Sequence, residues 1–485
     1  MKQKLKQIKL EDILCLYIIL CPILDIASYL FRNYFNTTIS ISTFLRPIIP
    51  IIFAVYIFIK ANKKHKLILL GIMLTYVLYG IIHLAVMKNF ITGCSYGGVK
   101  QELQYIINYS FLIINLIVFF YAFTNKKWRK KEIEIDTKQE KIRISVLIMC
   151  TIYIASIYIA ILTATSSYTY PYEQIGYKGW IESGNSLGAI LCISTFIILP
   201  LIKEKKYRIP AIIVIILTGI YLIALIGTRT GLIGFFLAVA VFITIEVLFS
   251  KNKVAIIGFV ILGVGVIVIG LVGSNTLKRR SQMNESMYTI IDEATGEVGH
   301  MTGDMLKIKN KILAGNLEEG YMSEAQKQAV LDLHEYTSEK QIAGNDTRTQ
   351  QLMYNIYLVK AQKSPMGILF GNGFETNFRE MIMENELASL LLNFGIIGFL
   401  LYAGPFIGVL IFGVITIIKK IKNKEKLETN YLMNFAALIL IFGLSYLSGY
   451  IFFNSSVMII IAAVCASLNF EKISWNLYYY FNYMI

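Results

Sequence analysis

The sequence predicts an all-α polytopic membrane protein with about twelve transmembrane helices and one large, mainly helical extracellular loop. Two observations predict this fold class. The chain of 485 residues is 56% hydrophobic, and long apolar runs recur along most of it. About 20 consecutive apolar residues are needed for a helix to cross the hydrocarbon core. Short clusters of Lys and Arg separate alternate runs, and such clusters mark cytoplasmic loops.

Apolar windows of membrane thickness define the individual spans. The predicted spans are residues 13–31, 40–59, 67–87, 104–124, 144–165, 183–202, 209–226, 229–249, 254–273, 395–418, 431–449 and 452–470. No small-residue cleavage site follows the first apolar run, so we expect the first span to be uncleaved. With the amino terminus inside and alternating directions, every basic cluster falls on the cytoplasmic side. Both termini are therefore predicted to be cytoplasmic.

The net charge of +15 follows from these loop clusters, which makes nucleic acid an unlikely partner class for this chain. The basic clusters lie at residues 2–9, 60–66, 126–131, 203–208, 251–253 and 419–426. Six cysteines lie mostly within apolar segments and show no paired or metal-type spacing. We predict neither a disulfide framework nor a zinc site.

The predicted domain organisation has three parts. Residues 1–273 form the first nine spans, residues 274–394 a large extracellular loop, and residues 395–485 the last three spans and a cytoplasmic tail. Helical periodicity covers residues 322–343 and 347–362 of the loop, and a glycine-bounded turn follows at residues 369–374. A connection of this length is expected to fold over the membrane surface.

The stretch IGTRTGLIGFF places Arg229 among apolar residues, at the turn between the seventh and eighth spans. A guanidinium presents fixed donors that suit phosphate oxygens, and charges near membrane helices are usually kept for a ligand or a partner. The alternative is that Arg229 reaches the headgroups or pairs with Glu102 or Asp25. Arg46 is a further cation at the same predicted surface, and Asp25 is interpreted as structural.

Two glutamates, Glu384 and Glu386, precede an apolar helix. Acidic residues at a helix start are favoured by the macrodipole, so capping is one interpretation. The other is that one carboxylate is a general base that takes a proton from a sugar hydroxyl. Arg348 begins a predicted helix in NDTRTQQ, where backbone donors favour an anion, whereas Arg279 alone is interpreted as a solvated surface arginine.

Several separated stretches together resemble the O-antigen ligase and Wzy-type polymerase superfamily. They are KQELQYIINYSFLI (100–113), KGWIESGNSLGAIL (178–191), GTRTGLIG (227–234), NDTRTQQL through LFGNGF (345–374) and ENELASLLLNFGIIGFLLY (384–402). Each stretch is short, but their order, the predicted spans and the single large loop before the G-I-I-G helix make the set specific.

This resemblance implies a glycosyltransferase that acts on polyprenyl-diphosphate-linked glycans without a metal, a nucleotide sugar or another cofactor. In the ligase branch the loop motif begins with a His-Asn pair, whereas here Glu384 and Asn385 stand at those positions. An acidic residue at 384 and another at 386 resemble the polymerase branch. Glu384 and Arg229 are the implied catalytic residues, and Arg229, Arg348 and Arg46 are implied to bind the diphosphate. Secondary candidates are Glu386, Glu102, Asn385, Asn185 and Arg279.

The predicted function is a surface polysaccharide polymerase of a bacterial plasma membrane, producing capsule or exopolysaccharide. It would move a lipid-linked glycan onto a lipid-linked repeat unit with inversion at the outer leaflet. The alternatives are a ligase that uses another acceptor, a polysaccharide transporter or lipid flippase, and a membrane scaffold. Expected partners are the lipid-linked oligosaccharide, membrane lipid, a flippase and a chain-length regulator. A transporter is disfavoured because no repeated halves are visible and the charges gather at one surface.

Overall fold

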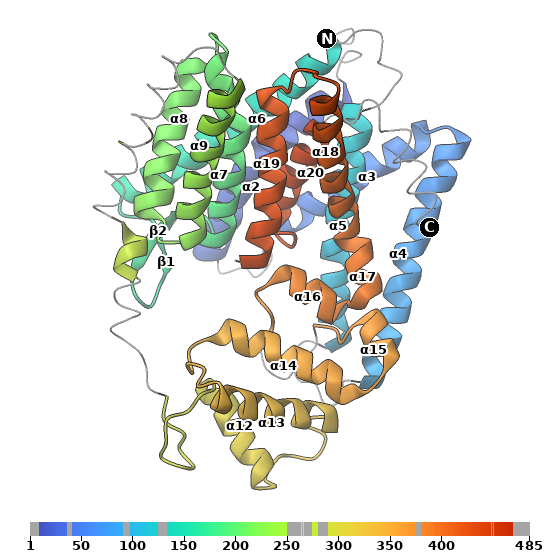
Figure 1. Cartoon of the computed structure of the whole chain (residues 1–485), viewed down its shortest axis with the longest axis vertical. Helices are drawn as coiled ribbons and strands as arrows, with labels where there is room; N and C mark the ends of the chain where they lie inside the picture. The colour runs from blue at the N-terminus through green and yellow to red at the C-terminus, as the bar shows by residue number, and fades with distance from the viewer. Residues whose placement is uncertain are drawn as a thin grey trace.

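The computed structural model describes residues 9–35, 41–90, 98–124, 133–249, 263, 265, 274–279, 290–374, 381–447, 449 and 451–468. Long helices form a bundle, and a group of shorter helices lies at one end of it (Figure 1). The bundle contains α2 (Leu10–Phe35), α3 (Ile41–Lys60), α4 (Lys63–Phe90), α5 (Gly98–Thr124), α6 (Ile133–Leu162), α7 (Gly184–Ile198), α8 (Arg208–Ile220), α9 (Arg229–Phe249), α17 (Gly395–Tyr402), α18 (Gly404–Lys422), α19 (Thr429–Leu447) and α20 (Ser455–Ser467).

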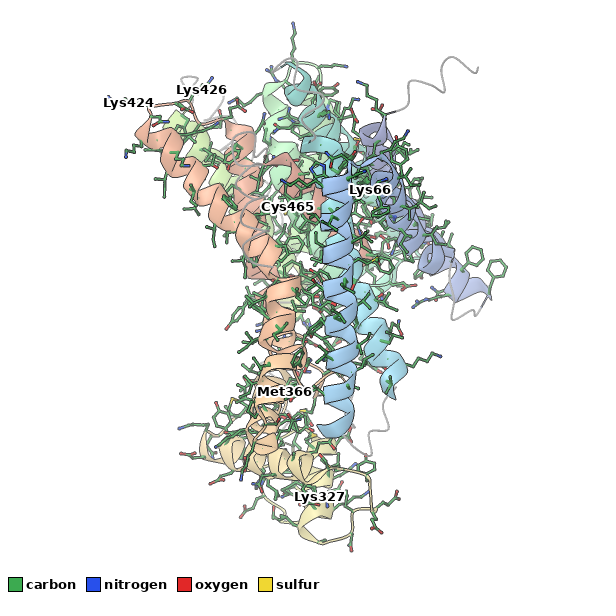
Figure 2. All side chains as sticks on the ribbon, turned by 90° about the vertical axis from the view of Figure 1, so that its right-hand side faces the viewer. Lys66, Lys327, Met366, Lys424, Lys426 and Cys465 are labelled. Atoms are coloured by element: carbon green, nitrogen blue, oxygen red, sulfur yellow. The ribbon has the colours of Figure 1, made fainter. Side chains whose placement is uncertain are left out.

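The shorter elements gather mostly at one end of the bundle, which we call the loop face. They are α12 (Gly303–Leu313), α13 (Glu324–Glu339), α14 (Thr347–Gln362), α15 (Pro365–Phe370), α16 (Glu386–Asn393) and the strands β1 (Ser167–Tyr170) and β2 (Ile175–Gly179). Figure 2 shows Lys327 at this end of the molecule, whereas Lys424 and Lys426 lie at the opposite end. The loop helices and these basic residues therefore occupy opposite ends of the bundle.

The prediction of an all-α polytopic membrane protein is confirmed. Within the described segments, nine helices are long and apolar enough to cross a membrane, and α20 is a shorter apolar helix. The predicted span 254–273 lies outside the described residues except for Gly263 and Gly265. The count of twelve and the extracellular position of the loop remain predictions.

The predicted span 395–418 is divided in the structure into α17 and α18. Pro405 has no backbone N–H, so it cannot donate to the carbonyl of Leu401 four residues earlier. The hydroxyl of Tyr76 on α4 donates to that carbonyl at 2.5 Å instead. A tyrosine from a neighbouring helix thus satisfies the acceptor that the proline leaves open inside the bundle.

Helix α7 is the centre of the bundle. All of its residues except Asn185 are buried, whereas α4 and α18 expose much of their apolar surface. Gly234 of α9 lets the backbone approach α7, because a Cβ at this position would lie only 2.6 Å from Sγ of Cys192. The apolar character of α4 and α18 therefore suits lipid, while that of α7 suits contact with other helices.

The loop helices have a hydrophobic core of their own. It contains Met301, Met305, Leu306, Met322, Ala329, Val330, Leu333, Tyr354, Leu358 and Met381.

The helices of the loop agree in part with the prediction. The predicted helix 347–362 coincides with α14, and the predicted helix 322–343 is longer than α13. Helix α13 begins with a capping box formed by Ser323 and Gln326. Helices α12 and α15 had not been predicted. The five described cysteines are free.

A buried ion pair fastens the beginning of this loop unit. Asp292 accepts from Lys309 Nζ at 2.6 Å and from Asn310 Nδ2 at 2.8 Å. The hydrogen bond from Lys309 lowers the pKa of Asp292 to about 2, below the ordinary range of an aspartate. Because the folded pKa is lowered, this stabilisation is complete above the unfolded pKa and is lost as the pH falls through the folded value.

We expect local stability near Asp292 to be constant above about pH 4 and to fall between there and pH 2. Amide hydrogen exchange across residues 290–313, corrected for intrinsic rates, measures this change. Asp292→Asn should exchange faster at neutral pH and lose the acid dependence. Asp332→Asn, which alters a carboxylate that accepts from Gln328 at the surface, is the control. An unchanged acid dependence in Asp292→Asn would contradict the assignment.

Candidate functional site

A tyrosine-rich hairpin covers the turn that contains Arg229. Strands β1 and β2 pair antiparallel, with Ser167 opposite Gly179 and Tyr168 opposite Tyr177. The hairpin touches the turn closely, because a Cβ on Gly176 would lie 2.2 Å from the carbonyl oxygen of Ile226. The hydroxyl of Tyr221 donates to the carbonyl of Tyr177 at 2.9 Å. Glycine at position 176 is therefore required for the hairpin to lie on the turn.

The segment before this turn is π-helical rather than α-helical. It spans Tyr221–Leu225 (η3), and π-turns inside helices are frequent at functional sites. Ser274 donates to the carbonyl of Ile223 at 2.9 Å, and Asn275 donates to that of Leu225 at 3.1 Å. The start of the large loop thus satisfies carbonyls of the irregular segment and fixes the turn.

Arg229 is the first residue of α9, and its side chain is exposed. Neither carboxylate proposed as its partner in the alternative interpretation is free to pair with it. Glu102 contacts His83, and Asp25 pairs with Arg46. Among the described residues, Arg229 forms no ion pair. Its guanidinium is therefore available to an anion.

Two further arginines share a neighbour with Arg229, the side chain of Tyr170 at the end of β1. The guanidinium carbon of Arg279 lies 3.4 Å from the centroid of the Tyr170 ring. Burial raises the pKa of Tyr170, and the positive charges of Arg279, Arg348 and Arg229 oppose this shift. The three guanidiniums, which we call the arginine cluster, thus come from α9, from residues 274–279 and from α14. Arg279 was only a secondary candidate in the sequence, because its contact with Tyr170 joins segments that are far apart in the chain.

Glu384 lies beside the arginine cluster. Arg348 Nε donates to Glu384 Oε2 at 3.0 Å, and Arg348 Nη1 donates to the carbonyl of Leu447 at 2.9 Å. The side chains of Arg348 and Glu384 are 56% and 38% exposed, and an exposed pair of this kind contributes about 0–1 kcal/mol. An incoming ligand can therefore separate the two charges at little cost. The backbone of Glu384 is fixed by Gln351, whose Oε1 accepts from its N–H at 3.2 Å.

Asn385 and Glu386 have different surroundings, although they follow directly in the chain. Asn385 caps α16, since its Oδ1 accepts from the N–H of Ala388 at 3.2 Å. Glu386 is buried, and its two oxygens accept three backbone N–H groups of residues 451–453 at 2.8, 2.8 and 3.0 Å. The secondary candidate Glu386 therefore holds the segment that leads into α20, and its oxygens are occupied.

Glu386→Ala is expected to destabilise the protein strongly, because each buried donor left unpaired costs about 1–3 kcal/mol. The melting temperature in detergent should fall by many degrees, with a loss of folded protein on expression. Glu335→Ala removes an exposed carboxylate on α13 and should leave the melting temperature nearly unchanged. Equal melting temperatures for the two variants would disprove the structural role.

Glu102, another secondary candidate, lies in a fully buried pair with His83. The Nε2 atom of His83 is 2.7 Å from Glu102 Oε1, and Nδ1 donates to the carbonyl of Phe370 at 2.6 Å. The other oxygen of Glu102 accepts from the N–H of Phe374 at 2.6 Å. The pair thus holds the glycine-bounded turn against α4 and α5. His83 was missed by the sequence analysis, although a histidine within an apolar span is a visible signal.

Arg46 and Asn185 lie inside the bundle rather than in the arginine cluster. Arg46 Nη2 donates to Asp25 Oδ1 at 2.5 Å, and Tyr153 and Ser456 donate to the other oxygen of Asp25. Asn185 lies in the first turn of α7 and is half-buried. Among the described residues, no group of three His, Cys, Asp or Glu side chains could share a metal ion.

The apolar bundle and the charged site on its loop face define a polytopic helical membrane protein with exposed polar chemistry at one end. The family model described as O-antigen ligase like membrane protein matches residues 7–472, and the chain belongs to this family. The predicted resemblance is thereby confirmed. No curated protein and no solved structure gives a significant match. Family membership indicates a membrane enzyme of glycosyltransferase type that acts on lipid-linked glycans.

Proposed function

We propose that the protein is a surface polysaccharide polymerase. It transfers a growing glycan from polyprenyl diphosphate to a hydroxyl of a second lipid-linked repeat unit at the outer leaflet, with the loop face outside the cell. The observation that carries this proposal is the contact between Arg348 and Glu384 beside Arg229 and Arg279. A general base and several diphosphate ligands are thus available on one surface.

Glu384 acts as the general base. Its carboxylate takes the proton of the acceptor hydroxyl as the hydroxyl oxygen attacks the anomeric carbon of the donor. The bond between that carbon and the diphosphate oxygen breaks on the opposite side, and polyprenyl diphosphate leaves with the bonding electrons. A single displacement of this kind inverts the configuration and forms no covalent enzyme intermediate.

The arginine cluster stabilises the leaving group. Negative charge grows on the diphosphate as the glycosidic bond breaks, and fixed guanidinium donors stabilise it without reorganisation. The guanidinium of Arg348 can exchange Glu384 for the diphosphate when substrate binds, because the exposed ion pair between Arg348 and Glu384 is weak. Binding of the donor would then free Glu384 to accept a proton. We assign Arg46 no part in binding the diphosphate, because Asp25 compensates its charge.

A ligase that transfers the finished polymer to another acceptor would use the same chemistry. A glutamate at position 384, where the ligase branch has a histidine, favours the polymerase. A transporter is the alternative from another class. Against it, the charges of the arginine cluster lie at one end of the bundle rather than midway between repeated halves.

Reconstitution separates these functions. Purified protein in detergent, given only the lipid-linked repeat unit and no ion gradient, should produce a ladder of longer lipid-linked glycans. A ligase would give a product only after addition of a different acceptor, and a transporter would give none. Analysis of the anomeric configuration of the new linkage tests inversion. Failure to form any glycosidic bond with either acceptor would overturn the proposed function.

A further inference from the structure

A second polar site lies inside the bundle, apart from the arginine cluster. It is a cavity of about 240 Å³ between α2, α3, α5 and the first turns of α7 and α20. At about 30 Å³ per water molecule it has room for roughly eight waters. Its walls are mostly amides, hydroxyls and paired charges, although it is surrounded by apolar helices.

One face of α5 lines this cavity along its length. Gln104, Asn108 and Asn115 are four and seven residues apart, so they lie on the same side of the helix. With a rise of 1.5 Å per residue, they extend about 16 Å along the helix axis. Gln104 is exposed and Asn115 is buried. The cavity therefore runs from a mouth near Gln104 into the bundle.

The charges around the cavity compensate one another. Arg46 pairs with Asp25 at 2.5 Å, and Arg32 pairs with Glu182 at 3.0 Å near the mouth. A diphosphate would have to compete with these carboxylates for the guanidiniums. In the arginine cluster, by contrast, only Arg348 has a carboxylate partner among the described residues. The cavity thus suits a neutral ligand, and the arginine cluster suits an anion.

Buried polar atoms without partners face this space. Asn115 is 4% exposed, and within the described segments its Oδ1 accepts no hydrogen bond and Nε of Arg46 donates none. The amide of Asn108 also forms no hydrogen bond with the described part of the chain. Buried polar atoms of this kind are costly unless a ligand or water satisfies them. Amides both donate and accept, as do the hydroxyl groups of a sugar.

The cavity and the arginine cluster lie near each other on the hairpin. Gly184, next to the cavity residue Ser183, packs so closely on Thr169 of β1 that a Cβ would lie 2.6 Å from its Cγ2. The next residue of β1 is Tyr170, which the guanidinium of Arg279 covers. The two sites are therefore joined through adjacent residues of one strand.

We propose that this cavity binds one uncharged sugar ring of the lipid-linked glycan while the arginine cluster binds the diphosphate. The inference rests on the proposed function and deepens it, because it assigns the sugar and the phosphate to separate sites. Asn108 and Asn115 bind the ring hydroxyls, and the pair between Arg46 and Asp25 keeps the cavity neutral. The residues that select the glycan are then different from the residues that bind the diphosphate.

Thiol protection tests the occupant without measuring activity. In a Cys94→Ser background the five described native cysteines are buried, so Gln104→Cys provides an accessible thiol at the mouth. Polyprenyl diphosphate carrying the native oligosaccharide, at about ten times its Kd, should slow methanethiosulfonate labelling about tenfold. Lys100→Cys, exposed at the same end of α5 but outside the cavity, should show no protection.

Polyprenyl diphosphate without sugar is the second probe. It should leave the labelling rate of Gln104→Cys unchanged. Equal protection by the sugar-free carrier would overturn the proposal in favour of a lipid or phosphate site. Absence of protection by both probes would overturn it in favour of a cavity filled only with water.

Kinetics give an independent readout. Asn108→Leu keeps the side-chain size but removes the amide, and KM for the lipid-linked substrate should rise about 5- to 150-fold with little change in kcat. Ser110→Ala, whose hydroxyl bonds to Ile106 and Tyr402 and does not line the cavity, should keep both constants. If the wild type elongates glycan and Asn108→Leu has an unchanged KM, the sugar site is refuted and the enzyme assignment stands. If the wild type forms no glycosidic bond, the proposed function fails instead.

Discussion

Glu384→Gln is expected to reduce the rate of glycan elongation by about 10²- to 10⁴-fold, the usual contribution of a general base. The amide cannot take a proton from the acceptor hydroxyl. Its oxygen can still accept a hydrogen bond from Arg348, whose Nε lies 3.0 Å from Glu384 Oε2 in the wild type. The melting temperature in detergent should therefore stay close to that of the wild type. The measurement is initial rate at saturating substrate, together with thermal unfolding of the same preparation.

Glu335→Gln is the matched control, because it makes the same chemical change at an exposed position of α13. It should retain full activity. Wild-type rates in Glu384→Gln would show that another group removes the proton. A low rate accompanied by a large fall in melting temperature would indicate a structural role, as expected for Glu386 two residues later.

Arg229→Ala is expected to lower kcat by about 10²- to 10³-fold, the usual effect of removing one group that stabilises developing negative charge. Arg229 is exposed and forms no ion pair among the described residues, so its loss should not unfold the protein. Arg229→Lys should recover only part of the activity, because an ammonium keeps the charge but lacks the planar fork. Elongation rates of both variants, measured beside the wild type, test whether activity falls in the order wild type, Arg229→Lys, Arg229→Ala.

Lys424→Ala removes the same formal charge at the opposite end of the molecule (Figure 2). It should retain wild-type activity and thereby control for net charge. Activity of Arg229→Ala equal to that of Lys424→Ala would refute a role of Arg229 in binding the diphosphate.

The positions of most spans along the chain could be predicted from the sequence, because lipid imposes a length and an apolar character on each membrane helix. Helix α9 and helix α14 have the predicted bounds. The break between α17 and α18 was not predicted. A proline inside a membrane helix is tolerated when a neighbouring helix donates a hydrogen bond to the carbonyl that the proline leaves without a partner, as Tyr76 does here. That neighbour lies far away in the chain.

The candidate site was only partly predictable for the same reason. Glu384 and Glu386 look alike in the sequence, because both precede an apolar helix. Their roles differ through residues 451–453, which meet Glu386 and leave Glu384 exposed. The polar face of α5 was visible in the spacing of Gln104, Asn108 and Asn115 but was overlooked. The cavity that it lines depends on five helices and could not be predicted from one of them.

The central position of α7 has a consequence for biogenesis. Its neighbours α19 and α20 are synthesised much later in the chain than α7 itself. During insertion α7 must therefore remain stable while it faces acyl chains on sides that protein later covers. The apolar span 184–203, which begins with α7, has a mean hydropathy of 2.1, so it can face lipid during this time. A strongly polar substitution on the side of α7 that meets α19 is expected to impair assembly of the bundle.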